Sequence, residues 1–255
     1  MKKLIDFSKY SSIKIGALKE VLILTPDNYD NHIIIGKATN TLITPNARNL
    51  AVLDEKFKFI EIKNSLLYVG AKTNNRILYN FCKKHNIKGF EFLNKLPGTI
   101  GGSIKMNAGV KEYEISNNLI AIQTQKGVVE KKDLHFSYRN SDIKDVIFSA
   151  VFNIEKGFDY NLDTKLKQLR SNQPKAPSLG SVFKNPKDDY AARLIEKAGL
   201  KGLRIGGVKI SEIHANFFIN VGGGSCEDMI KLIEITKKEV YEKFGVLLEE
   251  EIKII

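Results

Sequence analysis

The segment LPGTIGGSIKMNAGV, residues 96–110, combines four glycines with small polar residues in a pattern typical of anion binding. Glycines let backbone amides approach an anion closely, and successive N–H groups form a concave site for a phosphate. Neither the GxGxxG fingerprint nor the Walker A loop occurs in the chain. The segment therefore predicts a phosphate-binding loop, although a glycine-rich turn needed only for tight packing would give the same pattern.

A second candidate loop follows the apolar run HIIIG. The run ends at Gly36, and Lys37, Ala38, Thr39 and Asn40 follow before apolar residues resume. A buried strand that ends in a glycine and a short polar loop can hold a diphosphate through its backbone amides. A plain β-turn is the alternative. Two such loops in one basic domain indicate an anion of dinucleotide size.

Three further segments carry side chains that could act on a carboxylate or a proton. Arg139 lies between an aromatic and small hydroxyl residues in FSYRNSD, which suits a guanidinium that meets a carboxylate or phosphate. Ser181 lies in SLGSVFKNP, where no GxSxG nucleophile elbow occurs. The three glutamates at 249–251 lie in a predicted strand, whose alternation places one of them on the opposite face. A surface arginine, a structural turn and a solvated strand edge are the corresponding non-functional interpretations.

The composition narrows the class of protein. Hydrophobic residues make up 43% of the 255 residues and charged residues 27%, as in an ordinary globular protein. No apolar run approaches the roughly 20 residues of a membrane span, and no secretory signal follows the first lysines, so we expect a cytoplasmic protein without membrane insertion. Cys82 and Cys226 do not make a disulfide framework. Cys82 and His85 have C-x-x-H spacing but no second pair, so we predict no metal.

The formal charge of +11 favours anionic partners. Nucleic acid, anionic lipid and phosphorylated small molecules all fit this charge, but the lysines are scattered and no RNP motif, basic zipper or zinc-finger spacing occurs. A generally lysine-rich composition explains the charge without any partner.

The hydrophobic pattern predicts an α+β fold that changes character near residues 155–160. Strands are expected in the first half, together with a helix over 73–86 that buries Ile77, Phe81 and Cys82. Helices are also expected in the second half. The last is expected to start at Ser225, which forms a capping box with Asp228, to run to Phe244 and to end at Gly245, with Met229, Ile233, Val240 and Phe244 on its buried face. The expected strands are 21–24, 32–36, 51–54, 57–62, 66–70, 146–154, 215–220 and 246–255, with a hairpin over 120–132 that turns at 126–127. The other expected helices are 160–172 and 190–198.

In this order, the segments resemble the UDP-N-acetylenolpyruvoylglucosamine reductase family of bacterial peptidoglycan synthesis. The resemblance covers nearly the whole chain: YSSIKIG, IIIGKATN, LPGTIGGSIKMNAG, FSYRNS, RSNQP, GSVFKNP, AARLIEKAGLKGLRIGG, HANFFIN and LEEEIKII. It implies an α+β fold with a two-lobed FAD-binding domain of the para-cresol methylhydroxylase type, residues 1–156, with lobes 1–48 and 49–156. A substrate-binding α+β domain, residues 157–255, would follow.

The resemblance also implies a reaction and its residues. NADPH would reduce FAD, and the enolpyruvyl ether of a UDP-sugar would then take the hydride at C3 in a protein expected to be a monomer. Arg139 and Glu251 would polarise the substrate carboxylate, and Ser181 would deliver a proton to C2. The implied FAD-binding residues are Gly36, Lys37, Ala38, Thr39, Asn40, Pro97, Gly98, Thr99, Gly101, Gly102, Ser103, Asn107, Ala108 and Gly109. The implied substrate-binding residues are Tyr138, Arg170, Lys184, Asn185 and His214.

Three features depart from the family pattern, and two other classes of protein compete with it. Ala38 occupies a position where glycine is common, Lys253 replaces an arginine, and the substrate-covering insertion of longer relatives is absent. Another flavoprotein of the same superfamily is one alternative, although no Cys or His for covalent flavin attachment lies in the glycine loops. A basic nucleic-acid-binding module without catalysis is the other, and it would be colourless.

Overall fold

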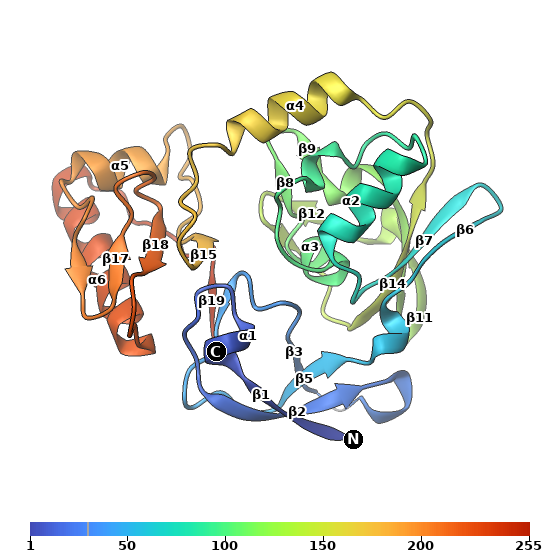
Figure 1. Cartoon of the computed structure of the whole chain (residues 1–255), viewed down its shortest axis with the longest axis horizontal. Coiled ribbons are helices and arrows are strands. Elements are labelled where there is room, and N and C mark those ends of the chain that lie inside the picture. The colour runs from blue at the N-terminus through green and yellow to red at the C-terminus, as the bar shows by residue number, and fades with distance from the viewer. Residues whose placement is uncertain (30) are drawn as a thin grey trace. The chain divides into compact units, whose positions relative to one another are not determined.

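A computed structural model describes residues 1–29 and 31–255 and divides the chain into two compact units (Figure 1). The first unit contains Met1–Lys2, Val21–Gly36 and Asn49–Ser171, and the second contains Lys3–Glu20, Lys37–Arg48 and Asn172–Ile255. Two N-terminal segments therefore belong to the unit that holds the C-terminus. The boundary predicted at residue 156 divides FAD binding from substrate binding, not these two compact units, and it remains a prediction.

The chain alternates short strands with six α-helices among its described residues. The helices are α1 (Phe7–Tyr10), α2 (Asn75–Lys84), α3 (Ile100–Lys105), α4 (Tyr160–Leu169), α5 (Ala191–Lys197) and α6 (Cys226–Phe244). The strands are β1 (Lys2–Asp6), β2 (Leu18–Leu24), β3 (Ile33–Ile34), β4 (Thr41–Leu42), β5 (Leu50–Leu53), β6 (Ile60–Lys63), β7 (Leu66–Gly70), β8 (Gly109–Val110), β9 (Tyr113–Glu114), β10 (Leu119–Thr124), β11 (Gly127–Glu130), β12 (Phe136–Ser137), β13 (Asn140–Ser141), β14 (Ile147–Asn153), β15 (Ser178–Ser181), β16 (Arg204–Ile205), β17 (Val208–Ile210), β18 (Phe217–Asn220) and β19 (Lys253–Ile254). Short 3₁₀ turns are η1 (Pro26–Asn28), η2 (Glu55–Phe57), η3 (Glu91–Leu93), η4 (Ile115–Asn118) and η5 (Lys131–Asp133).

A five-stranded antiparallel sheet of order β11-β10-β14-β7-β6 forms the centre of the first unit (Figure 1). Alternation along β14 buries Phe148, Ala150 and Phe152, because successive side chains of a strand point to opposite faces. Phe90 packs edge-on against Phe152 with ring centroids 5.4 Å apart. Each such phenylalanine contributes roughly 2–3 kcal/mol through burial. In the same unit β2 pairs with β5, and β5 with β3, all in parallel.

Helix α4 is tied to the rest of the first unit by a buried carboxylate. Asp163, which is 3% exposed, accepts hydrogen bonds from Tyr79 Oη at 2.8 Å, Asn94 Nδ2 at 2.6 Å and Lys83 Nζ at 3.0 Å. The ammonium of Lys83 also lies 5.2 Å from the ring centroid of Tyr160, within cation–π range. Desolvation of Asp163 is therefore offset by three donors, all of them from buried or half-buried residues.

The second unit contains an antiparallel sheet of order β15-β18-β17-β16 together with α5 and α6. Helix α6 starts with the predicted capping box, in which Ser225 Oγ accepts from the Asp228 amide and Asp228 Oδ2 accepts from the Ser225 amide, both at 3.0 Å. The helix ends at Gly245, whose φ of +67° is the left-handed C-cap that glycine favours. In the same unit β19 pairs in parallel with β4, with Lys253 opposite Thr41.

The buried faces of two helices differ from the sequence prediction. Ile77 is 44% exposed, and α2 instead buries Leu78, Tyr79 and Cys82. The buried stripe is set by the hydroxyl of Tyr79, which must reach Asp163, and this turns Ile77 towards solvent. Phe244, at the end of α6, is 38% exposed rather than buried.

The predicted C-terminal strand is also shorter than expected. Only Lys253–Ile254 is a strand, and Glu250 forms an isolated bridge with Phe183. The carbonyl of Val182 accepts both the Glu251 amide at 2.8 Å and the Ile252 amide at 3.4 Å. Because one acceptor takes two successive amides, the chain bends there and strict strand alternation does not hold.

Candidate functional site

The glycine-rich segment of the first unit contains a short helix rather than a continuous loop. Helix α3 begins after Thr99, whose hydroxyl accepts the Gly102 amide at 3.4 Å. The Gly101 amide donates to Ala71 O, and a Cβ at Gly101 would lie 2.9 Å from the Ala71 Cβ. The Gly101 amide is therefore no donor for a ligand, contrary to the expected nest, and Gly101 serves close packing. A Cβ at Gly102 would meet only the Thr99 hydroxyl, at 3.4 Å.

Gly36 and Thr99 show that the two candidate loops of the sequence meet in the fold. A Cβ at Gly36 would lie 2.8 Å from Thr99 Oγ1, closer than real Cβ contacts. Only glycine therefore lets the end of the β3 segment approach the start of α3 this closely. Gly36 and Thr99, which are far apart in sequence, thus lie close together in the first unit, and we call this pair a wall.

The loop that follows Gly36 belongs to the second unit and engages the protein through its carbonyls. The Ala38 carbonyl accepts the Ser12 amide at 3.2 Å, and the Asn40 carbonyl accepts the Lys253 amide at 2.9 Å. Ala38 has a φ of +46°, the left-handed region that favours glycine. Within residues 1–29 and 31–255, the backbone amides of residues 37–39 donate to no protein acceptor. These amides therefore suit an anion.

Asn107, at the end of the glycine-rich segment, carries a buried acceptor that the described protein does not satisfy. The residue is 1% exposed, and its Nδ2 donates to Glu114 Oε2 at 2.6 Å and to the Ser137 carbonyl at 3.2 Å. Both partners are acceptors, which fixes the orientation of the amide. Its Oδ1 is buried and has no hydrogen-bond partner among the described residues. A buried orphan acceptor of this kind fits a ligand donor.

Arg139 lies in the turn of the β12–β13 hairpin, close to Asn107. Its φ of +56° is unfavourable for a side chain longer than glycine, and such strain is common at functional sites. Its Nη2 donates to the Gly109 carbonyl at 3.0 Å, and its Nη1 lies 3.9 Å from Glu114 Oε1. The guanidinium carbon lies 4.9 Å from the ring centroid of Tyr138. Sequence reasoning did not identify Glu114, because no local motif links it to an arginine so far along the chain.

Ser181 and Glu251 come together in the second unit. Ser181 ends β15, beyond Gly180 at φ +82°, and pairs with Phe217 of β18. The next residue, Val182, accepts the Glu251 amide at 2.8 Å. Asn40 Nδ2 donates to the Glu251 carbonyl at 3.0 Å. These contacts bring the backbone of Glu251 next to Asn40 and to the residue after Ser181, within one unit.

The three C-terminal glutamates have different partners. Glu249 forms an ion pair with Lys184, and Glu250 forms one with Lys237 at 2.9 Å. Glu251 is half-buried, and its backbone is held on both sides as described above. Lysines therefore engage Glu249 and Glu250, and the choice of Glu251 as the functional carboxylate stays a prediction.

The predicted substrate-binding residues lie in both units. In the first unit, Arg170 caps the C-terminus of α4 and Tyr138 is 48% exposed. In the second, Asn185 Oδ1 accepts the Ala191 amide at 3.2 Å, at the start of α5. Burial lowers the pKa of His214 below its usual 6.5, so its ring is neutral at pH 7. Its Nδ1 accepts the Asn216 amide at 3.3 Å.

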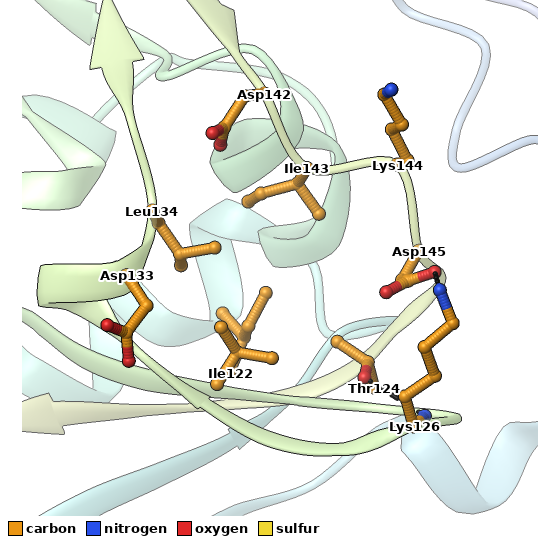
Figure 2. A pocket seen from close by; sticks show the side chains of 10 residues that line it. Ile122, Thr124, Lys126, Asp133, Leu134, Asp142, Ile143, Lys144 and Asp145 are labelled. Atoms are coloured by element: carbon orange, nitrogen blue, oxygen red, sulfur yellow. Dashed lines mark hydrogen bonds and ion pairs between the residues drawn. The ribbon is translucent and has the colours of Figure 1, made fainter.

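A pocket of about 280 Å³ in the first unit is lined by none of the predicted site residues (Figure 2). Apolar side chains and charged ones line it: Ile122, Thr124, Lys126, Val129, Asp133, Leu134, Asp142, Ile143, Lys144 and Asp145. Asp145 forms an ion pair with Lys126 at 2.9 Å, and Asp142 Oδ2 lies 2.9 Å from His135 Nδ1. Over the described ranges, no cluster of three or more His, Cys, Asp or Glu residues suits a metal ion.

Comparisons with known proteins identify the family of the chain. A sequence model described as UDP-N-acetylenolpyruvoylglucosamine reductase, C-terminal domain, matches residues 173–255. The UDP-N-acetylenolpyruvoylglucosamine reductase of Campylobacter jejuni strain RM1221 is 46% identical over 257 residues, covering 99% of this chain and 100% of the relative. That of Helicobacter hepaticus is 45% identical over 258 residues, covering 99% and 98%. The crystal structure of the Thermus caldophilus reductase matches with a TM-score of 0.89 at 25% identity, covering 100% of this chain and 98% of that one.

The fold and these matches define an oxidoreductase of α+β architecture, with a FAD-binding domain and a substrate-binding domain as the sequence predicted. The chain belongs to the UDP-N-acetylenolpyruvoylglucosamine reductase family. In the part of the chain that the structure describes, none of the helices is long and apolar enough to cross a membrane.

Proposed function

We propose that the protein reduces the enolpyruvyl ether of UDP-N-acetylglucosamine enolpyruvate to UDP-N-acetylmuramate, with FAD as cofactor and NADPH as reductant. Family membership supports the reaction, and one structural observation supports the cofactor site most strongly. This observation is the wall formed by Gly36 and Thr99, together with the buried, unsatisfied Oδ1 of Asn107. The close approach of Gly36 to Thr99 brings the two predicted loops together, and the orphan acceptor of Asn107 fits a ligand that has a donor group.

Bound FAD would supply hydride transfer from NADPH to C3 of the substrate. In the first unit, Gly36, Thr99 and Asn107 would contact it, with the neighbouring Pro97, Gly98, Gly102, Ser103, Ala108 and Gly109. In the second, the amides of residues 37–39 would bind an anionic part. Gly101 would contribute through its packing against Ala71 rather than through its amide.

The chain's own residues would handle the charge and the proton. Arg139 and Glu251 would hold the substrate carboxylate, where negative charge develops after reduction at C3. Ser181 would give its hydroxyl proton to C2 as a general acid. Arg170, Tyr138, Lys184, Asn185 and His214 would bind the rest of the substrate. The buried, free thiols of Cys82 and Cys226 suit a reducing compartment, and we place the enzyme in the cytoplasm.

This division of labour extends the functional boundary already predicted. We propose that residues 1–156 mainly bind FAD and that residues 157–255 mainly bind the UDP-sugar. The loop at 37–40 accepts backbone hydrogen bonds from Ser12 and Lys253, which belong to the second unit. The flavin-binding function of this loop therefore depends on contacts made by the C-terminal segment.

Ser181→Ala tests the proposed reaction because Ser181 acts only after the hydride has reached the substrate. The purified variant should be yellow and should bleach with NADPH at the wild-type rate under anaerobic conditions. Return of the colour on addition of UDP-N-acetylglucosamine enolpyruvate should slow by roughly 10²- to 10⁴-fold, as expected for a lost general acid. Ser178→Ala, in the same strand, is the matched control and should leave both rates within about two-fold. A serine with only a structural role would instead lower both half-reactions together.

A further inference from the structure

Glu114 lies at the point where the glycine-rich segment meets the Arg139 hairpin. We propose that Glu114 is a positioning residue that holds the Arg139 guanidinium in the orientation needed to meet the substrate carboxylate. The inference rests on the proposed role of Arg139, and it adds a residue that takes no part in the chemical steps. Three sets of contacts carry it.

The first set fixes the Glu114 backbone next to the glycine-rich segment. Glu114 pairs with Gly109 in the β8–β9 hairpin. A Cβ at Gly109 would lie 2.3 Å from the Tyr113 carbonyl oxygen and 2.9 Å from the Glu114 Cα. Glycine at 109 is therefore needed for β9, and with it Glu114, to lie this close to β8.

The second set fixes the Glu114 carboxylate. Its Oε2 accepts from Asn107 Nδ2 at 2.6 Å, and the same Nδ2 donates to the Ser137 carbonyl at 3.2 Å. Ser137 belongs to β12, directly before the turn that carries Arg139. Asn107 thus joins the carboxylate to the backbone of the arginine's own hairpin, so the two elements cannot shift independently.

The third set places a hydrogen-bonded carbonyl and a nearby carboxylate at one guanidinium. Arg139 Nη2 donates to the Gly109 carbonyl, and Nη1 lies 3.9 Å from Glu114 Oε1. The side chains of Arg139 and Glu114 are only 17% and 23% exposed, so their attraction is less screened than at the surface. Gly109 and Glu114 are themselves paired, and together they restrict the rotation of the guanidinium plane.

Orientation matters because the arginine binds a planar carboxylate. A guanidinium recognises a carboxylate through parallel N–H donors, and a rotated plane loses this match. Glu114→Gln keeps the shape and an acceptor for Asn107, but it replaces the charged oxygen near Arg139 with an amide. The expected defect is therefore confined to the step in which the substrate carboxylate is bound and its charge stabilised.

The test compares Glu114→Gln with wild type in the FAD-loaded protein. We expect unchanged flavin content and NADPH reduction, and reoxidation by UDP-N-acetylglucosamine enolpyruvate slowed roughly 10- to 100-fold, as for a misplaced binding group. Affinity for UDP-N-acetylmuramate, measured by calorimetry on the oxidised protein, should fall as well. Glu112→Gln is the matched control, because Glu112 is exposed and lies two residues away. Glu114→Asp, which keeps the charge on a shorter side chain, should give a smaller defect.

A double-mutant cycle shows whether Glu114 acts through Arg139. Adding Glu114→Gln to Arg139→Gln should slow reoxidation by less than two-fold beyond Arg139→Gln alone. The positioning role is wrong if Glu114→Gln behaves like Glu112→Gln, or if it causes its full defect in the Arg139→Gln background. If Arg139→Gln leaves reoxidation unchanged, the proposed function of Arg139 fails instead, which distinguishes the two outcomes.

Discussion

The first unit holds two partly buried ionic clusters, one around Asp163 and one around Arg139. Asp163 accepts three hydrogen bonds from side chains, and none of the four residues in its cluster has a positive φ. In the other cluster, Arg139 and Asn107 both have left-handed backbones, and Asn107 Oδ1 is buried without a partner in the described chain. Strain and unsatisfied atoms persist only where the surroundings enforce them, and they gather at functional sites.

The difference assigns a separate role to each cluster. We expect the Asp163 cluster to contribute to stability, since its carboxylate accepts from three side chains of the protein. We propose that the Arg139 cluster keeps binding capacity for a ligand at some cost in stability. The predictions below test this separation, in order of decreasing effect.

Arg139→Gln should give the largest change. The neutral amide cannot stabilise the charge that develops at the substrate carboxylate, so reoxidation by the UDP-sugar should slow by about 10²- to 10³-fold, or roughly 3–4 kcal/mol. The free energy of unfolding should change by less than about 1 kcal/mol. Stopped-flow absorbance and urea unfolding measure the two quantities. A large loss of stability with normal reoxidation would show that the arginine has a structural role and no role in the reaction.

Asp163→Ala should show the opposite pattern. Removing the carboxylate leaves Tyr79 Oη and Asn94 Nδ2 without their acceptor, and we expect a loss of about 3 kcal/mol in the free energy of unfolding. Reoxidation at temperatures well below the midpoint should stay within a few-fold of wild type. Lys83→Met is the control and should cost less, because the Lys83 side chain is 36% exposed.

Acid should weaken the Asp163 cluster specifically. Desolvation raises the pKa of Asp163, but hydrogen bonds from Asn94, Lys83 and Tyr79 outweigh it and hold the pKa below 3.8. The folded pKa lies below the unfolded one, so the stabilisation is present above the unfolded pKa and is lost as the pH falls through the folded pKa. The stability lost between pH 5 and pH 3 should therefore be smaller in Asp163→Asn than in wild type. Equal pH dependence in urea unfolding would show that the carboxylate is not ionised in the folded protein.

Ala38→Gly should give the smallest effect and extends the comparison to the second unit. The left-handed φ of Ala38 favours glycine, so the variant should gain up to about 1 kcal/mol of stability despite the greater entropy of the unfolded chain. Ala51→Gly, in the extended strand β5, should lose stability instead. A loss at both positions would show that the loop at 37–40 is not strained.

Local signals were readable from the sequence, and long-range ones were not. The capping box of Ser225 and Asp228 and the terminal Gly245 lie in one helix, so residue type and spacing sufficed to predict them. The contact of Gly36 with Thr99 and the link from Glu114 to Arg139 join distant segments, which no periodicity encodes. The residues proposed to act near these contacts were predicted from the family resemblance.

The C-terminal strand illustrates the same limit of sequence patterns. Alternation predicted a strand through the three glutamates, whereas the shared acceptor at Val182 bends the chain at Glu251. The choice of Glu251 rests on the family resemblance and stays a prediction. Ion pairs with lysines of other elements, which strand alternation does not encode, engage Glu249 and Glu250.

The most direct test of the account is the rate at which NADPH-reduced protein regains its flavin absorbance with UDP-N-acetylglucosamine enolpyruvate in the absence of oxygen. The account predicts rapid recovery in wild type and in Asp163→Ala, with formation of UDP-N-acetylmuramate, and recovery at least 10²-fold slower in Arg139→Gln. A wild-type protein that stays bleached with this substrate but recovers with oxygen would contradict the proposed reaction. Equal slowing in Arg139→Gln and Asp163→Ala would contradict the separation of the two clusters.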